Sequence, residues 1–345
     1  ARLNKGKSIS FSTKLTKGAF KNMNIDFIGK RKIFYVLSAI VILFGGYSLS
    51  TKGLDYGIDF SGGRTYIVNI SNETITNEDI KESLSKVFVN EDGSVQAIQV
   101  SKFKDLTEPD SLNQKIVAVN AVKITTKYMI DSDDKNADSI VTATLLNGLG
   151  SDFTDDNIVS YQKVASTIAD DIRSSAWGSI IFSLLVIFLY ILVRFKKWQF
   201  SLGAVIAVFH DVLIVLSVFS IFYGILPFSL EIDQAFIAAI LTIIGYSLND
   251  TVVVFDRVRE YMNDYKKKEV HELINQSLNS TLSRTVNTSL TTFFVLLIIF
   301  LFGGEIIKGF MFALMVGVVV GTYSSLFVAS PIMVDTIKRK EIKNK

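Results

Sequence analysis

The sequence predicts an α-helical membrane protein: six transmembrane helices, with one α+β ferredoxin-like domain between helices 1 and 2. Three observations support this fold class. Hydrophobic residues make up 49% of the 345 residues, the mean hydropathy is +0.37 and only three residues are proline, which favours an integral membrane protein. Six segments are apolar over about 20 residues, the length that a helix needs to span a bilayer. A long polar stretch separates the first of them from the second.

The six apolar segments divide the chain into regions. The predicted spans are residues 33–50, 176–193, 200–223, 235–255, 288–302 and 308–330. A basic segment (1–32) precedes the first span, the polar domain covers 51–175, the last five spans form a bundle over 176–330, and a basic tail covers 331–345. The first span lies too far from the start of the chain for a signal peptide, so we expect it to remain as an anchor.

The distribution of Lys and Arg predicts the orientation of these spans. Nine lie in residues 1–32 and five in the tail, whereas the loop 224–234 has none. Positive charge marks cytoplasmic loops, so we expect both termini in the cytoplasm and residues 51–175 outside. That outer stretch holds 12 of the 36 Lys and Arg but 20 of the 33 Asp and Glu. The charge pattern therefore reflects membrane topology, and we expect no nucleic-acid partner.

The outer stretch has the pattern of a small α+β domain. Alternating apolar residues predict strands at 64–70, 95–103, 116–125 and 158–164, and helical spacing predicts helices at 77–89 and 138–146. The order βαββαβ is that of a ferredoxin-like domain, built from two split βαβ units. Asn77, followed by Glu78 and Asp79, is expected to cap the first of these helices.

Residues suited to catalysis are missing from the outer stretch. The chain has no Cys, and its two His residues lie elsewhere. The acidic groups near Asp131 and Asp152 lack the spacing of a calcium loop. We therefore predict that the protein is not an enzyme and holds no metal or organic cofactor. The domain is expected to bind or brace another molecule, and an edge of its sheet could accept an extended peptide as an added strand.

Asp250 and Arg284 are the candidate ion-coupling pair. Asp250 lies within the fourth span, and Arg284 stands at or just before the first turn of the fifth, at a comparable depth. A carboxylate inside a bilayer costs about 2.5–3.5 kcal/mol and marks a proton or ion path. A pair that forms and separates as Asp250 loses and gains a proton would couple a gradient to helix movement, whereas a permanent pair would only fix packing.

Polar neighbours extend this candidate site. Ser247, Asn249 and Thr251 offer oxygen ligands beside Asp250, so the coupling ion is a proton or a sodium ion. Asn287 and Thr288 follow Arg284 on one helix face.

A second ionisable pair lies in the third span. His210 and Asp211 are either a proton relay or a hydrogen-bonded pair within the core. In the last span, Gly317 and Gly321 have the spacing that lets helices pack closely.

Three motifs carry a resemblance that covers about residues 23–335. They read GIDFSGG at 57–63, GYSLNDTVVVFDR at 245–257 and SRTVNTS at 283–289. In this order, and in a layout of one span, outer domain and five spans, they resemble the SecF family of the bacterial SecDF protein-export complex, within the resistance-nodulation-division superfamily. Within the first motif, the glycines Gly57, Gly62 and Gly63, with Asp59, are typical of a tight periplasmic turn between span and sheet. The alternative is that this motif contacts the exported client directly.

The resemblance implies a multi-pass protein of the bacterial inner membrane. Its partners would be a SecD-like half, the SecYEG channel, SecA, unfolded exported proteins and membrane lipid. It would use the proton motive force for protein export, with Asp250 and Arg284 in ion coupling. Two departures are present: Arg64 stands where the family more often has a Thr-like residue, and the basic residues before Met23 suggest a linker from a fused SecD–SecF precursor.

Two alternative functions remain open from the residues. One is an exporter of small molecules or lipids in the same superfamily, which would need an apolar pocket in the outer domain. The other is a scaffold of the export complex that transduces no gradient, in which the buried charges only set helix packing.

Overall fold

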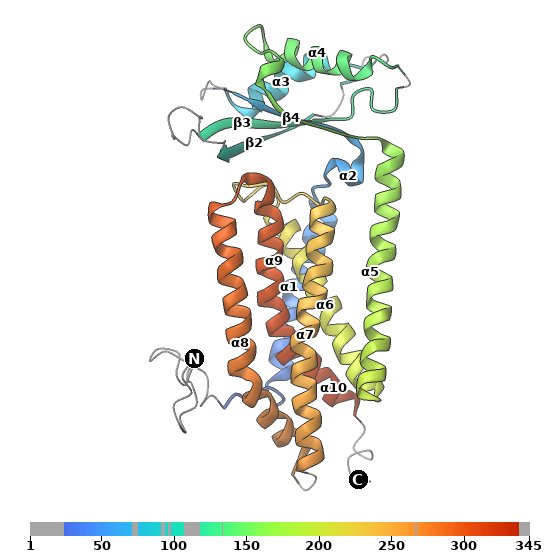
Figure 1. The fold of residues 1–345 in the computed structure, drawn as a ribbon, viewed down its shortest axis with the longest axis vertical. Coiled ribbons are helices and arrows are strands. Elements are labelled where there is room, and N and C mark those ends of the chain that lie inside the picture. Colours follow the sequence, from blue (N-terminus) through green and yellow to red (C-terminus); the bar gives the residue numbers. More distant parts are fainter. Residues whose placement is uncertain are drawn as a thin grey trace, which may run out of the picture.

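The computed structural model places an α/β domain on one end of a long helical bundle (Figure 1). It describes residues 24–70, 75–90, 94–95, 98–106, 118–132, 134–265 and 268–337. The predicted fusion linker before Met23 and most of the basic tail lie outside the described residues.

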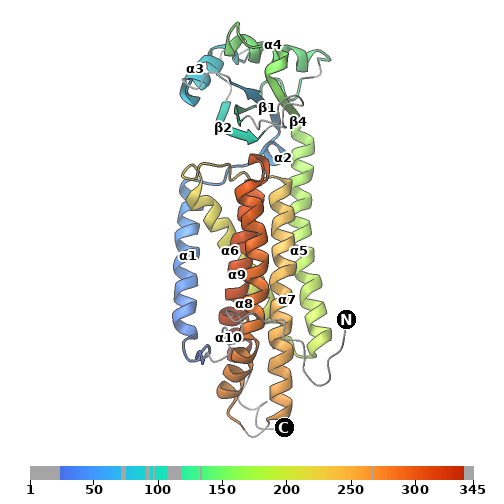
Figure 2. The same ribbon diagram turned by 60° about the vertical axis from the view of Figure 1, so that its left-hand side comes forward.

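Six helices in the described part of the chain are long and apolar enough to cross a membrane, as predicted. They are α1 (Arg31–Thr51), α5 (Ser166–Phe195), α6 (Trp198–Phe222), α7 (Gln234–Asp264), α8 (Val270–Phe302) and the composite helix Glu305–Thr336. The composite helix consists of α9 (Glu305–Ser324), a π-helical turn (Ser325–Ala329) and α10 (Ser330–Thr336). Figure 2 shows α1 and α5 on opposite sides of the bundle, with α6, α7 and α9 between them.

Most of these helices extend beyond the apolar runs that predicted them. Helix α8 differs most, because it begins at Val270 rather than near residue 288. The added turns are amphipathic: Leu273, Ile274, Leu278 and Leu282 are buried in the core cluster at this end of the bundle. Arg284 therefore lies well inside a helix, and its predicted place at the first turn was wrong.

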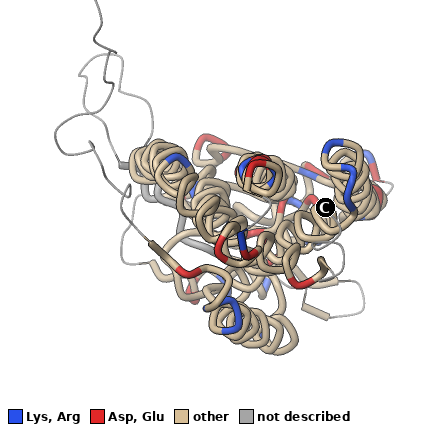
Figure 3. The backbone as a smooth tube through the Cα atoms, turned by 90° about the horizontal axis from the view of Figure 1, so that it is seen from below, with Lys and Arg blue, Asp and Glu red and all other residues tan. Residues whose placement is uncertain are grey.

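Helix α9 packs against α6, α7 and α8. In the view along the bundle from below (Figure 3), most of the visible tube is free of charged residues. Ion pairs gather near the ends, such as Arg194 with Asp256 (2.9 Å) and Arg31 with Asp335 (2.9 Å). This pattern is expected for helices whose middle turns face lipid or one another.

The domain between α1 and α5 has the predicted ferredoxin-like topology. Its elements are α2 (Ile58–Ser61), β1 (Gly63–Asn69), α3 (Asn77–Val87), β2 (Ile98–Leu106), β3 (Ala118–Thr126), α4 (Ala137–Leu149), a 3₁₀ turn (Asp155–Asn157) and β4 (Ile158–Val164). The strands form one antiparallel sheet in the order β2-β3-β1-β4. Helices α3 and α4 cover the face that points away from the bundle (Figure 1).

The N-cap of α3 is Thr76 rather than Asn77. The Thr76 hydroxyl accepts a hydrogen bond from the Asp79 backbone N–H, while the Asp79 carboxylate accepts one from Thr76. This reciprocal capping box satisfies two backbone N–H groups, which a cap at Asn77 would not do with Asp79.

Alternation along β1 separates the two faces of the sheet. Tyr66 and Val68 are buried against α3 and α4, whereas Thr65 and Ile67 line a cavity on the bundle side. Arg64 points to the helix face, where its fully buried guanidinium bonds Asp138 (2.7 Å) and the Tyr128 carbonyl (2.6 Å). The departure from the family pattern at Arg64 is therefore matched by a partner on α4.

Candidate functional site

Asp250 is buried where three helices meet. It lies on α7, its side chain is 4% exposed, and its Oδ2 accepts a hydrogen bond from Ser289 of α8 (3.3 Å). The Thr322 hydroxyl of α9 lies 2.5 Å from that of Ser289. A carboxylate held by one long hydroxyl contact is poorly compensated for the loss of water when it is ionised.

Arg284 does not form an ion pair with Asp250 within 4.0 Å, although the structure describes both side chains. It is exposed on α8 and lines a hollow of about 370 Å³ together with Asp256, Arg257 and Glu260. The structure therefore holds the two candidate residues in a separated arrangement, and their coupling stays a prediction.

The neighbours of Asp250 point in different directions. Successive residues of an α-helix lie about 100° apart, so Ser247 and Thr251 direct their hydroxyls elsewhere: to Asp211 (2.6 Å) and to Ser325 (2.8 Å). Asn249 is exposed. The expected set of oxygen ligands around Asp250 is not assembled here, because the sequence neighbours lie on different faces of α7.

Asn249 belongs to an exposed polar face on α7 and α8. Arg284, Asn287 and Thr288, which share one face of α8, are exposed as well. The Thr288 hydroxyl returns to the Arg284 carbonyl (3.0 Å), which partly satisfies it. The amides of Asn249 and Asn287 need partners outside this chain if the face lies within a membrane.

Asp211 is another buried carboxylate of the bundle. Its Oδ2 accepts hydrogen bonds from Ser247 of α7 (2.6 Å) and Ser324 of α9 (2.8 Å), and its Oδ1 lies 3.1 Å from His210 Nδ1. The side chain is 1% exposed. Helix α7 thus contacts both buried carboxylates, contributing Ser247 to one site and Asp250 to the other.

Gly317 and Gly321 bring α9 close to α7. A Cβ atom at Gly317 would lie 2.2 Å from Ile243, and one at Gly321 would lie 2.9 Å from the Cβ of Ser247. Only glycine permits this approach, so the spacing seen in the sequence serves close packing beside Asp211.

The GIDFSGG turn connects the α/β domain to the start of α7. The Gly57 N–H bonds the Ile232 carbonyl (3.1 Å), and the Ile232 N–H bonds the Asp55 carbonyl (2.7 Å). Asp59 accepts a hydrogen bond from the N–H of Gln234, the first residue of α7 (3.1 Å). The motif is therefore a joint between the domain and the helix that carries Asp250.

Gly62 and Gly63 supply the backbone conformation of this turn. Their φ angles are +66° and +140°, a region that residues with a Cβ rarely adopt. A Cβ at Gly63 would also lie 3.0 Å from the Thr126 carbonyl of β3.

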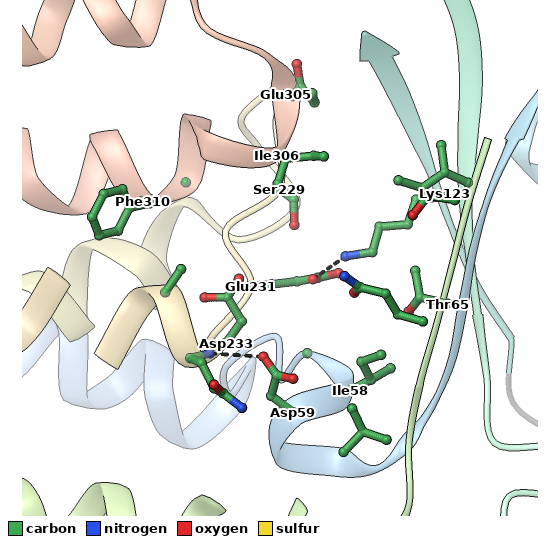
Figure 4. Close-up of a pocket in the computed structure, with 18 of the residues that line it drawn as sticks. Ile58, Asp59, Thr65, Lys123, Ser229, Glu231, Asp233, Glu305, Ile306 and Phe310 are labelled. Carbon is green, nitrogen blue, oxygen red and sulfur yellow. Dashed lines mark hydrogen bonds and ion pairs between the residues drawn. The ribbon is translucent and has the colours of Figure 1, made fainter. Parts of the chain in front are cut away.

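A cavity of about 620 Å³ separates the sheet from the bundle at this joint (Figure 4). Lys123 of β3 reaches across it and pairs with Glu231, in the loop before α7. Burial raises the pKa of Asp55 and of Asp233, the N-cap of α7. The joint therefore brings the carboxyl groups of Asp55, Glu231 and Asp233 together, and Lys123 pairs with one of them, Glu231.

Three contributors to these sites were absent from the sequence prediction. Ser289 and Thr322 near Asp250, and the Lys123–Glu231 pair, come from segments far apart in the chain. Ser289 belongs to the SRTVNTS motif and lies five positions after Arg284. That motif was a signal for Ser289, whereas nothing local marks Lys123.

Comparisons with known proteins agree with this architecture. Residues 143–339 match the family "Protein export membrane protein SecD/SecF, C-terminal", and residues 47–72 match the "SecD/SecF GG Motif". The protein translocase subunit SecF of Rhodothermus marinus is 44% identical over 316 residues, covering 92% of this chain and 94% of the relative. That of Petrotoga mobilis is 37% identical, covering 92% and 98%.

Solved structures show the same fold. The crystal structure of SecDF from Thermus thermophilus, described as a translocon-associated membrane protein, superposes with a TM-score of 0.73 at 27% identity over 91% of this chain. A SecDF structure in a super-membrane-facing form gives 0.61 at 28% identity over 94%. This chain spans only 39% and 40% of those two SecDF chains. On the family matches and the SecF relatives together, the chain belongs to the SecD/SecF family of protein export membrane proteins, as a multi-pass subunit of the SecF type.

Proposed function

We propose that this protein is an accessory subunit of the Sec translocon, driven by the proton motive force, which assists protein export across the bacterial inner membrane. The observation that carries the proposal is the environment of Asp250: a buried carboxylate with one hydroxyl partner, on a transmembrane helix, with Arg284 on the next helix but apart from it. An isolated buried carboxyl group favours holding a proton, and an approaching guanidinium favours releasing it.

Helix α7 offers a physical route from that proton to the α/β domain. It runs without interruption from Gln234 to Asp264, so Asp250 and the Gln234 N–H that bonds Asp59 lie on one rigid element. A shift of α7 on protonation would move the joint, and with it the sheet through the Lys123–Glu231 pair. In this mechanism the domain rocks as it holds or releases a client.

The exposed polar face on α7 and α8 supports a SecD-like partner half. Asn249, Arg284 and Asn287 would be costly against lipid, and a second bundle would cover them. The chain also spans about two fifths of each SecDF chain it resembles. SecYEG and SecA would be further partners, and unfolded exported proteins the clients.

The proposed topology puts both termini in the cytoplasm and the α/β domain on the outer side. Its support is the basic N-terminal segment and tail against the acidic outer stretch. The cavity below the sheet has a mixed lining, with Lys123, Glu231 and Asp233 beside apolar residues such as Ile67 and Phe310, whereas an exporter of lipids or small molecules would need an apolar pocket. We therefore do not favour the exporter reading.

The test is export of a reporter protein in membrane vesicles carrying the assembled complex, with and without an ion gradient. We expect Asp250→Asn and Arg284→Ala to lose the gradient-dependent part of export and keep the rest. Asp256→Asn is the matched control, because this carboxylate lies on the same helix but pairs with Arg194 and Arg259 at the bundle end. Undiminished export in both test variants would contradict ion coupling and favour the scaffold role. Collapsing the proton gradient and the sodium gradient in separate experiments identifies the coupling ion.

A further inference from the structure

The His210–Asp211 pair lies at one end of a hydrogen-bonded chain whose direction can be worked out. The contacts run from His210 Nε2 to Ser38 Oγ (3.0 Å), from Ser38 Oγ to the Tyr323 hydroxyl (3.0 Å), and from Tyr323 to the Phe34 carbonyl (2.9 Å). They join α6, α1 and α9. The Tyr323 ring also stacks on the imidazole, with centroids 5.9 Å apart.

The carbonyl at the far end sets the donors along this chain. A carbonyl only accepts, so the single Tyr323 proton is directed at Phe34. Tyr323 must then accept from Ser38, and Ser38 in turn must accept from His210. His210 therefore carries a proton on Nε2.

That assignment leaves one proton to place between Nδ1 and Asp211 Oδ1, which are 3.1 Å apart. A neutral imidazole with its proton on Nε2 presents a lone pair at Nδ1, and this would face a carboxylate lone pair. The contact is a hydrogen bond only if one more proton is present, on the imidazole or on the carboxyl group. Either way the pair has no net charge, which suits its burial, with His210 7% and Asp211 1% exposed.

We propose that His210 and Asp211 form a second proton-binding site of the bundle, distinct from Asp250 and holding one proton between the two side chains. Loss of that proton to solvent leaves a neutral imidazole protonated on Nδ1, which donates to the Asp211 carboxylate. Nε2 then accepts from Ser38, and Ser38 accepts from Tyr323. Because Tyr323 has one hydroxyl proton, its bond to the Phe34 carbonyl breaks.

Proton occupancy is thereby linked to the contact of α9 with α1. Among the described elements packed on α6, Tyr323 is the titratable side chain that contacts the His210–Asp211 pair. The carboxylates on the neighbouring helices have other partners: Asp250 of α7 bonds Ser289, and Asp335 of α10 pairs with Arg31. Tyr323 and Ser324 directly precede the π-helical turn that starts at Ser325, an irregularity common at functional sites.

The test is nitrogen NMR of the imidazole rings in the purified full chain, labelled on histidine. The chain has two histidines, and His271→Gln removes the exposed one. At neutral pH we expect Nε2 of His210 to be protonated. If the shared proton is on the imidazole, Nδ1 is protonated as well. If it is on the carboxyl group, the infrared spectrum shows a protonated carboxyl band that disappears in Asp211→Asn. A His210 protonated on Nδ1 alone would overturn the proposal, and so would the absence of both signatures.

A second variant tests the direction of the chain. Tyr323→Phe removes the group to which Ser38 donates, so Ser38 becomes free to donate to Nε2, and we expect the form protonated on Nδ1 to appear. Tyr246→Phe is the matched control, because Tyr246 bonds Thr292 between α7 and α8 and is not part of this chain. An identical His210 spectrum in both variants contradicts the proposed linkage. Neither measurement depends on protein export, so the proposal for His210 and Asp211 is tested independently of the proposed function.

Discussion

Gly321→Ala should separate α9 from α7 without changing any ionisable group. An added Cβ would lie 2.9 Å from the Ser247 Cβ and 3.3 Å from its Cα, whereas ordinary contact begins at 3.4 Å. The shortfall of about 0.5 Å falls on atoms that no rotation of a side chain can move. The helices must therefore separate, and the separation stretches the bonds from Ser247 and Ser324 to Asp211.

The expected cost is that of overpacking a close-packed interior, about 1–3 kcal/mol. This corresponds to an unfolding equilibrium about 5–150 times less favourable to the folded state. Gly317→Ala should cost less than its 2.2 Å approach suggests, because the atoms it meets are the side-chain carbons of Ile243, which can change rotamer.

The assay is the unfolding free energy of the purified protein, from titration of mixed micelles with SDS. Gly245→Ala and Gly46→Ala are the controls, since an added Cβ meets no atom within 4 Å at either position. Both should be neutral or stabilising, because alanine favours helix more than glycine by about 1 kcal/mol. A Gly321→Ala protein as stable as the controls would refute the reasoning. In the export assay, we expect Gly321→Ala to weaken the gradient-dependent part and Gly46→Ala to leave it unchanged.

Further predictions concern the α/β domain and its joint. Asp138→Ala should destabilise the sheet because it leaves the Arg64 guanidinium buried without its carboxylate partner. We expect a loss of about 3 kcal/mol, the lower end of the range for breaking a buried ion pair, since Asp138 is half exposed. Hydrogen exchange of the β1 amides measures this loss of stability. Hydrogen bonds from Lys163 and Arg64 lower the pKa of Asp138. The ionised Asp138 therefore contributes its full stabilisation above pH 3.8, its ordinary pKa, and loses it as the pH falls through the lowered pKa. The acid unfolding curve of Asp138→Asn should lack this pH-dependent loss. Lys123→Glu should broaden the distance distribution between spin labels on α4 and α8, and the reciprocal Glu231→Lys should narrow it again; the absence of Cys leaves no background labelling.

The fold followed from patterns that are local along the chain. Six apolar runs and a βαββαβ alternation are enough to predict the spans and the ferredoxin-like sheet, because each element buries one face or crosses lipid. The start of α8 could not be read in this way. Its first turns are amphipathic and contain no continuous apolar run, so a search for membrane-spanning segments does not include them. The packing of Leu273 and Leu278 in the core of the bundle stabilises these turns as helix.

The candidate site was predictable only in part. Asp250 and Asp211 stand out because a carboxylate in an apolar run is costly, and the structure buries both. Their partners were not predictable, since proximity in sequence is a poor guide to proximity on a helix: Thr251 follows Asp250 directly but contacts Ser325 instead. The hydroxyl donors come from α7, α8 and α9, and their contacts depend on how these helices pack.

Helix α7 connects the environments of two buried carboxylates, Asp211 and Asp250. Ser247 and Asp250 are three residues apart, so they occupy neighbouring positions on α7, yet Ser247 reaches Asp211 on α6 and Asp250 reaches Ser289 on α8. A movement of α7 therefore alters both environments at once. Because Gln234 at the start of the same helix is held by Asp59, such a movement also reaches the sheet. If α7 moves as a rigid rod, Asp250→Asn and a break at Asp59 should impair the same gradient-dependent step, and combining Asp250→Asn with Asp59→Ala should add nothing to the loss from either alone. Additive losses in the export assay would mean that the joint and the ion site act independently.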